Sequence, residues 1–260
     1  MKLSIVIPAY NEEKRISGTL EEYGRFFTDL KKNKILDSEI LIVINNTKDK
    51  TEEIVRKYSK KYPLLIRWLN FKRGGKGFAI IEGFKEALKK ETDLIGFVDA
   101  DMSTKPNSFY DLVNNVRGYD GIIASRYLPG SKVSPKPSLK RIVISRVFNF
   151  LIRTMFLFNY KDTQCGAKVF KSNAIKEIVS SLEITQWAFD IDLLYKLKRA
   201  GKKVLEFPSE WSDKEYSHIN FFKSSTRMFL AIWRLRIKNS KFNFLIRGYD
   251  LLPSWLKIKI

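Results

Sequence analysis

The sequence predicts an α/β protein with a mostly parallel sheet flanked by helices. Short apolar runs alternate with charge-rich amphipathic segments in the first half of the chain, a pattern typical of strands joined by helices. One amphipathic segment opens just after the glycine-rich stretch Arg73–Gly77. The acidic pair in Asp99-Ala100-Asp101 directly follows an apolar run, where open α/β sheets bind their ligands. These observations together indicate a nucleotide-binding half.

Each element is expected from a local pattern. Strands are predicted at the apolar runs Ser4–Pro8, Glu39–Ile44, Leu64–Leu69, Leu94–Val98 and Gly121–Ala124. Helices are predicted at Glu12–Leu30, Thr51–Lys61 and Gly77–Lys90. After Arg126, Pro129-Gly130 and Pro135-Lys136-Pro137 predict a loop over the mouth of the sheet. Further helices are predicted at Leu139–Phe158, Ala174–Ser181, Asp190–Ala200 and Ser224–Lys238, with a strand at Val204–Pro208.

The length and the composition of the chain allow it to form a large hydrophobic core. The chain has 260 residues, of which 44% are hydrophobic and 13% aromatic. The single cysteine, Cys165, cannot form a disulfide within the chain, and a strand-like segment follows Met1-Lys2 where a signal peptide would have its apolar region. We therefore expect a cytoplasmic protein, with a catalytic domain over residues 1–215 and a basic amphipathic segment over residues 216–260.

The net charge of +20 calls for an anionic partner, which could be nucleic acid, an anionic membrane or a phosphorylated small molecule. Residues 131–160 contain six basic residues and no acid, and residues 216–260 contain nine basic residues and one acid. Both stretches are also rich in large apolar side chains, which suits helices lying at an anionic membrane surface. Ordinary packing of these helices on the core is the alternative. Arginines interrupt both stretches, so we expect no spanning helix.

Acidic and basic residues are expected to gather at one sheet edge. Asp99 and Asp101 offer hard oxygen ligands for Mg²⁺ or Mn²⁺ bridging a diphosphate, although they could instead cap the following turn. Arg73 and Lys76 place cations beside a glycine-rich turn that could meet a phosphate, or could form a solvated basic turn. Arg126 follows the next strand at the same edge and is a candidate for clamping a phosphate of donor or acceptor.

Several motifs occur in an order that resembles a known family. They are Ile5–Glu13, Arg73–Gly77, Val98–Asp101, Ala124–Tyr127 and Asp162–Phe170. The set resembles the family 2 inverting glycosyltransferases of GT-A fold and, within them, the dolichyl-phosphate sugar synthases. Asp162–Phe170 and Trp187–Leu194 favour the dolichyl-phosphate β-glucosyltransferase branch. The resemblance implies transfer of a hexose, with glucose from UDP-glucose expected, to a polyprenyl or dolichyl phosphate with the help of Mg²⁺ or Mn²⁺.

The resemblance also implies roles for individual residues. Asp99 would lie on the ribose side, and Asp101 on the side of the metal and the diphosphate. A basic residue that faces the diphosphate in relatives would fall close to His218, the only histidine. The residues implied in the nucleotide pocket are Pro8, Ala9, Tyr10 and Glu12, and those implied around the transferred sugar are Asp162 and Gln164.

Asp190 is a candidate for positioning the acceptor. A sugar hydroxyl acting as nucleophile would need a carboxylate base. A lipid monophosphate, with a second pKa of roughly 6, is already ionised at neutral pH. We therefore expect Asp190 to orient groups if the acceptor is a lipid phosphate, and to act as a base if the acceptor is a saccharide hydroxyl. Asp192, two residues on, could simply cap the start of the helix.

One departure from the family concerns the base. Many relatives carry Asp-Asp-Gly-Ser after the second strand, whereas this chain has Asn45-Asn46-Thr47-Lys48. An Asn45 amide can both donate to and accept from uracil, while guanine would lose a carboxylate partner, so a UDP-sugar is favoured. A GDP-mannose-dependent mannosyltransferase and a transferase acting on a saccharide hydroxyl remain alternatives. A nucleic-acid-binding module is not expected, because it leaves the acidic pair unexplained.

Overall fold

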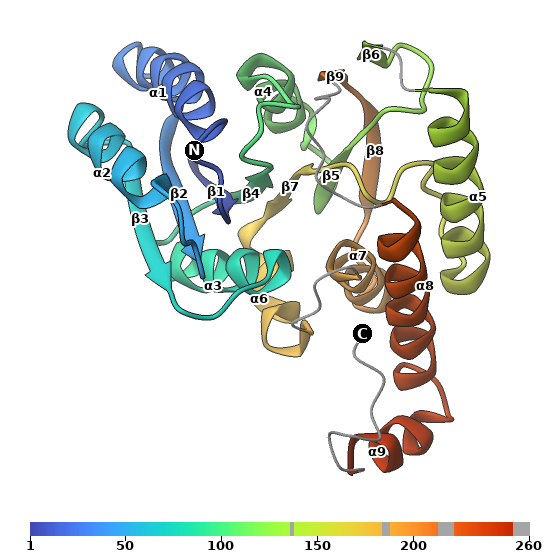
Figure 1. The fold of residues 1–260 in the computed structure, drawn as a ribbon. Coiled ribbons are helices and arrows are strands. Elements are labelled where there is room, and N and C mark those ends of the chain that lie inside the picture. Colours follow the sequence, from blue (N-terminus) through green and yellow to red (C-terminus); the bar gives the residue numbers. More distant parts are fainter. Residues whose placement is uncertain (136–137, 184–187, 213–220, 252–260) are drawn as a thin grey trace.

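The computed structural model describes residues 1–135, 138–183, 188–212 and 221–251. At its centre is a seven-stranded sheet in the order β3-β2-β1-β4-β7-β5-β8 (Figure 1). Its strands pair in parallel except β7, which is antiparallel to both β4 and β5. The predicted mostly parallel sheet is therefore confirmed. The strands are β1 (Lys2–Ala9), β2 (Asp37–Asn45), β3 (Ile66–Phe71), β4 (Leu94–Val98), β5 (Gly121–Ser125), β7 (Ala167–Lys171) and β8 (Val204–Pro208).

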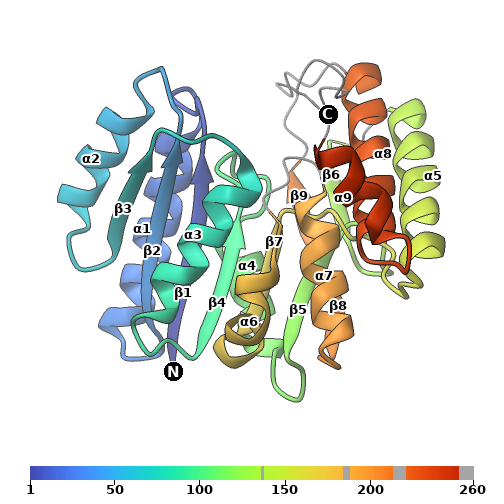
Figure 2. The same ribbon diagram turned by 90° about the horizontal axis from the view of Figure 1, so that it is seen from below.

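Helices cover both faces of the sheet (Figures 1 and 2). One face carries α1 (Ile16–Lys32), α2 (Thr51–Lys61) and α4 (Pro106–Asn115); the other carries α3 (Lys76–Leu88), α6 (Ser172–Ile178) and α7 (Phe189–Arg199). The side chains of β1 alternate between two buried clusters, because Ile5 and Ile7 belong to one and Val6 to the other. Burial on both faces explains why the strands read as continuous apolar runs.

The later elements lie at one end of the sheet. The helices α5 (Leu139–Phe156) and α8 (Phe221–Lys238) run side by side there, and α9 (Asn243–Leu251) follows (Figures 1 and 2). Ile232 and Leu235 of α8 are buried in the same cluster as Ile152 of α5. The described part of the C-terminal segment is therefore anchored on the domain that holds the sheet. The remaining elements are β6 (Lys132–Ser134), β9 (Glu210–Ser212), which pairs with it, and the 3₁₀ helix η1 (Val179–Ser181).

Within the described ranges, no helix combines the length and the apolar character needed to cross a bilayer. Every predicted strand is present, with ends displaced by two residues at most. The first helix begins at Ile16 and not at Glu12, because the amides of Arg15 and Ile16 both donate to the Glu12 carbonyl in a preceding turn. The elements α4, β6, β7, β9 and α9 were not predicted from the sequence.

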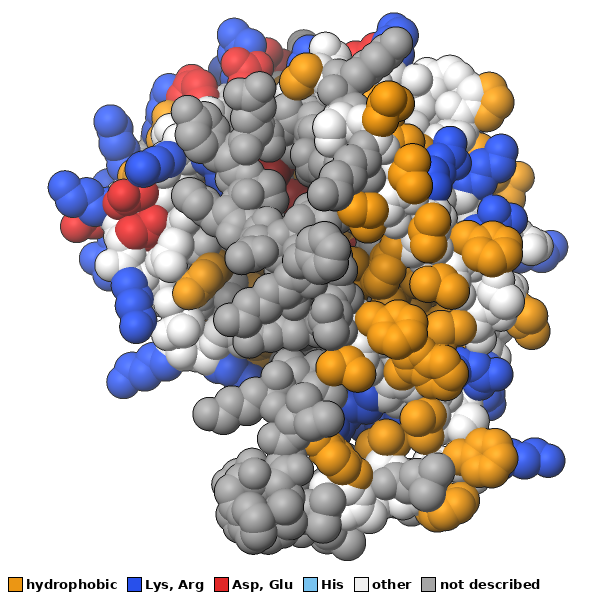
Figure 3. All heavy atoms as spheres, turned by 45° about the vertical axis from the view of Figure 1, so that its right-hand side comes forward, with side chains coloured by type: hydrophobic (Ala, Val, Ile, Leu, Met, Phe, Trp, Pro, Cys, Tyr) orange, Lys and Arg blue, Asp and Glu red, His pale blue; other side chains and the backbone are white. Residues whose placement is uncertain are grey.

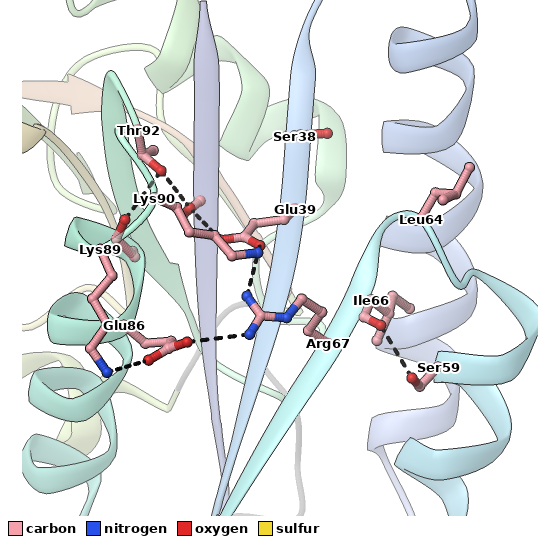
Figure 4. Close-up of polar contacts among 12 residues, drawn as sticks. Ser38, Glu39, Ser59, Leu64, Ile66, Arg67, Glu86, Lys89, Lys90 and Thr92 are labelled. Atoms are coloured by element: carbon pink, nitrogen blue, oxygen red, sulfur yellow. Dashed lines mark hydrogen bonds and ion pairs between the residues drawn. The ribbon is translucent and has the colours of Figure 1, made fainter.

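A charged network joins β2, β3 and the end of α3 near the beginning of the strands (Figure 4). Glu39 Oε2 lies 2.6 Å from Lys90 Nζ and 3.4 Å from Arg67 Nη1, and Arg67 Nη2 lies 3.2 Å from Glu86 Oε1. Each acid in this network has a basic partner. We interpret the network as a structural link between the sheet and α3 and not as a ligand site, because its charges already compensate one another.

Candidate active site

Asp99 lies at the sheet edge where β4 ends and β7 begins. The register places Val98 opposite Ala167, so the next residues, Asp99 and Gly166, are neighbours, and the Asp99 amide donates to the Gly166 carbonyl at 3.2 Å. The Asp99 carboxylate lies directly over the Gly166 Cα: a Cβ built there would be 1.9 Å from Asp99 Oδ2. A glycine at position 166 is therefore what allows the carboxylate to occupy this place.

Lys76 is the cation nearest to Asp99. Its Nζ lies 2.6 Å from Asp99 Oδ1, and it is the first residue of α3, directly after Gly75, whose φ of 125° favours glycine. Burial alone would lower the pKa of Lys76, but the negative charges of Asp99 and Asp190 outweigh it and raise that pKa. Burial also raises the pKa of Asp99, and Lys76 opposes this. The expected cation at the glycine turn therefore lies at the acidic pair.

Asp101 is held by its own turn. Its Oδ1 accepts a hydrogen bond from the Ser103 amide at 2.9 Å, and its Oδ2 lies 3.9 Å from Arg15 Nη1. Arg15 also donates from Nε and Nη2 to the two carboxylate oxygens of Glu12, each at 2.7 Å. Burial raises the pKa of Glu12 to about 7, against the opposing charge of Arg15. Arg15 thus connects the first loop with Asp101, a link that sequence reasoning missed.

Lys168 is a second cation that sequence reasoning missed. It lies on β7 with a fully buried side chain, and its Nζ donates to Asp190 Oδ1 at 2.5 Å and to the Cys165 carbonyl at 2.6 Å. Asp190 belongs to the first turn of α7. A buried ammonium group needs a carboxylate partner. A lysine between apolar residues of the sequence could therefore have indicated a buried ion pair. The ion pair fixes the position of one Asp190 oxygen.

The structure pairs Arg126 with Asp162, the residues predicted to contact a phosphate and the transferred sugar. Arg126 Nε and Nη2 donate to the two Asp162 oxygens at 2.7 and 2.9 Å, and the Arg126 amide donates to Oδ2 at 3.1 Å. Burial would raise the pKa of Asp162, but Arg126 holds it below its usual value. The fully buried Asp162 thus joins the end of β5 to the segment before β7.

Asn45, the residue predicted to contact the base, forms hydrogen bonds within the protein. Its side chain is 1% exposed, donates from Nδ2 to the Ala9 carbonyl at 3.0 Å and accepts at Oδ1 from the Gly75 amide at 2.9 Å. Both ends of the amide are therefore occupied within the protein. Asn45 thus ties the end of β1 to the glycine turn that presents Lys76.

The other predicted residues are distributed around this edge. Pro8 and Ala9 are buried at the end of β1, and Tyr10 is exposed just beyond it. The exposed Arg73 places its guanidinium 5.0 Å from the centre of the Phe78 ring. Gln164 Nε2 contacts the Met228 sulfur of α8 at 3.2 Å. His218 lies outside the described residues.

The acidic pair fits a divalent cation that is shared with a ligand. Asp99 and Asp101 offer hard oxygens two positions apart on one loop, and each carboxylate stays partly exposed, although Asp99 is paired with Lys76. No cluster of three or more His, Cys, Asp or Glu side chains suited to a metal occurs in the described part of the chain. Mg²⁺ and Mn²⁺ are commonly bound by one or two carboxylates, with phosphate oxygens and water completing the coordination. The pair meets that requirement only with a phosphate ligand present.

Asp192 is buried in the fold. Its side chain is fully buried, Oδ2 accepts from the Glu183 amide at 2.8 Å, and Oδ1 has no hydrogen-bond partner among the described residues. Burial raises the pKa of Asp192 to about 6. Its carboxyl group therefore serves the packing of α7, beside the ion pair of Asp190.

Replacing Asp192 by Asn should change how stability depends on pH. The folded pKa of about 6 exceeds the unfolded value of 3.8, so the folded wild type loses stability as pH rises through this interval. Asn does not titrate. The unfolding free energy of the variant minus that of the wild type should therefore increase by about 2 kcal/mol between pH of about 4 and about 8, measured by urea unfolding. A difference independent of pH would contradict this account.

Comparisons with known proteins identify a family and relatives for this chain. The family model described as Glycosyl transferase family 2 matches residues 4–179. The dolichyl-phosphate beta-glucosyltransferase of Dictyostelium discoideum is 31% identical over 245 residues, which cover 91% of this chain and 74% of that protein. The Homo sapiens dolichyl-phosphate beta-glucosyltransferase is 29% identical over 247 residues, covering 91% of this chain and 75% of that protein.

A solved structure shares the fold. Glucosyl-3-phosphoglycerate synthase from Mycobacterium tuberculosis, in complex with Mn²⁺, UDP and phosphoglyceric acid, superposes with a TM-score of 0.65 at 16% identity. The match covers 90% of this chain and 78% of that chain. It confirms the predicted GT-A-type arrangement of sheet and helices.

Proposed function

The chain belongs to glycosyl transferase family 2, and from this premise we propose that it transfers glucose from UDP-glucose to a polyprenyl phosphate such as dolichyl phosphate, with inversion. The observation that carries the proposal is the placement of Asp99 between Lys76 and Gly166 at the end of β4. The names of the relatives supply the sugar and the acceptor.

The donor diphosphate is assigned to the edge that carries Asp99 and Asp101. A bound Mg²⁺ or Mn²⁺ would supply positive charge to the leaving diphosphate. Asp101 is held toward this place by the Ser103 amide, and Lys76 stands at the N-terminus of α3, where backbone N–H groups also favour phosphate. Because Asn45 is engaged within the protein, the preference for uridine is supported by the UDP-bound glucosyl-3-phosphoglycerate synthase and not by that residue.

The acceptor phosphate is assigned to the neighbourhood of Asp190. A phosphate monoester with a second pKa of roughly 6 is a nucleophile at neutral pH without a base. Lys168 holds one oxygen of Asp190 at 2.5 Å, which suits a group that positions others. A saccharide hydroxyl would instead need a carboxylate free to take up its proton.

The surface formed by α5 and α8 supports docking on a membrane. Figure 3 shows hydrophobic side chains gathered on this side of the molecule, with Lys and Arg side chains around them. On α5, Phe150 is 64% exposed, and on α8, Trp233 is 47% exposed. The Gln164 contact with Met228 joins the predicted sugar segment to α8, so a lipid phosphate at this surface would be near the site. We assign the occupant as an anionic bilayer, at which the chain would associate peripherally from the cytoplasmic side.

Replacing Phe150 and Trp233 by Ser should weaken binding to vesicles of phosphatidylcholine and phosphatidylglycerol by about tenfold or more, because large apolar side chains leave the interface. The matched control replaces two exposed apolar residues elsewhere, Ile35 and Leu64, by Ser. Co-sedimentation measures all three proteins. Equal binding by both double variants would contradict the assignment of this surface.

The activity itself is tested with a panel of donors and acceptors. The protein is incubated with Mn²⁺, UDP- and GDP-sugars, and either dolichyl phosphate or free saccharides. We expect lipid-linked glucose from UDP-glucose. A lipid product formed only from GDP-mannose would replace the proposed donor, and transfer only to saccharides would replace the proposed acceptor.

A further inference from the structure

A cleft away from the acidic edge is strongly basic. It has a volume of about 980 Å³ and lies among α6, η1, the last turns of α7 and α8, and the link to α9. Only one acidic side chain, Glu177, lines it among the described residues. The basic residues that line it are Lys196, Arg199, Arg236, Lys238 and Lys241.

Much of this positive charge is not compensated within the protein. Glu177 forms an ion pair with Lys202, and Lys238 pairs with Glu183 at 3.0 Å. Three further cations, Arg199, Arg236 and Lys241, have no acidic partner in the described ranges.

The nearby Lys196 Nζ donates to Asn239 Oδ1 at 3.0 Å, a neutral amide that leaves its charge in place. Cations in the last turns of α7 and α8 are favoured by the helix dipoles, but Lys241 lies beyond the end of α8. A concave surface that concentrates like charges attracts an anion.

We propose that this cleft binds a phosphate-bearing ligand, as an anion site separate from the catalytic edge. Two guanidinium groups and two ammonium groups around one hollow match the charge and the acceptor oxygens of phosphate. The site is joined to the catalytic edge by one helix, because α7 carries Asp190 in its first turn and Arg199 in its last. A helix of this length separates its ends by about 15 Å.

The rim of the cleft is compatible with two sources of phosphate. Phe242 lines the cleft and is 61% exposed, so an apolar side chain stands beside the cations. A lipid phosphate at a bilayer would use both, and a soluble phosphate would use only the cations. The shared chemistry is the phosphate group, and the experiment separates its sources.

The test compares wild type with a cleft variant in which Arg199, Arg236 and Lys241 are replaced by Gln. A control variant replaces Lys57, Lys60 and Arg117 by Gln; these three residues are exposed and remote from the cleft. Both variants lose the same charge. Binding of inorganic phosphate is measured by calorimetry with and without UDP and Mn²⁺, which separates the cleft from the catalytic edge. Binding to phosphatidylcholine vesicles with and without phosphatidylglycerol is measured in parallel.

We expect the wild type and the control variant to bind phosphate in the presence of UDP, and the cleft variant to bind it about tenfold more weakly. A selective loss of binding to phosphatidylglycerol vesicles would assign the source to lipid. A loss confined to free phosphate would assign a soluble ligand. Equal phosphate and vesicle binding by both variants would overturn the proposal. None of these readouts requires glucose transfer, so failure here is distinguishable from failure of the proposed activity.

Discussion

Replacing Asp101 by Asn is expected to lower kcat/KM for glucosyl transfer by about 10³-fold, because the leaving diphosphate loses its metal-bound charge stabilisation. The Ser103 amide can still bond to the Asn oxygen, so the loop geometry should be retained. The folded state should change little, since Arg15 lies 3.9 Å from Asp101 and its stronger contacts are to Glu12.

Initial rates with UDP-glucose and a polyprenyl phosphate measure this effect, at several Mn²⁺ concentrations. The matched control is Asp111→Asn, which removes an exposed carboxylate from α4. UDP binding in the presence of Mn²⁺ should weaken in the Asp101 variant and stay unchanged in the control. Activity of the Asp101 variant within a few-fold of wild type would show that Asp101 does not carry the metal.

Replacing Gly166 by Ala is expected to lower kcat/KM by about 10²-fold. The new Cβ would lie 1.9 Å from the present position of Asp99 Oδ2, so the carboxylate must move, and small misplacements of reacting groups are costly. Lys76, which lies 2.6 Å from Asp99, would have to follow or lose its partner. Fold and secondary structure should be retained.

The control for this variant is Gly18→Ala. No atom lies within 4 Å of a Cβ at Gly18, which is in α1, so alanine there should leave activity unchanged and stabilise the helix. A double-mutant cycle gives the sharper check: in an Asp99→Asn background, Gly166→Ala should have a much smaller further effect. Full additivity would mean that Gly166 acts through something other than Asp99.

The strands were predictable because burial on both sheet faces leaves apolar runs such as Leu94–Val98 in the sequence. The edge position of Asp99 and Asp101 followed from the end of that run. In contrast, β7 was hidden because Lys168 interrupts its apolar pattern, and only the tertiary partner Asp190 accounts for a lysine there. Local periodicity does not report such a pairing.

Several polar groups at the site have partners that lie far away in the sequence. Arg126 and Asp162 are 36 residues apart, and the folded chain pairs them with one another. Asn45 likewise forms hydrogen bonds with the Ala9 carbonyl and the Gly75 amide, 36 and 30 residues away. Which polar groups remain for a ligand depends on the folded arrangement, whereas which groups lie at the edge depends mainly on strand ends.

The most direct test of the proposed reaction is the structure of the product formed from UDP-glucose and dolichyl phosphate in the presence of Mn²⁺. The proposal predicts a lipid-linked glucosyl phosphate with β configuration at the anomeric carbon, as determined by NMR, and no product when a chelator removes the metal. An α-linked product, or no lipid-linked glucose under conditions in which a free saccharide is glucosylated, would contradict it.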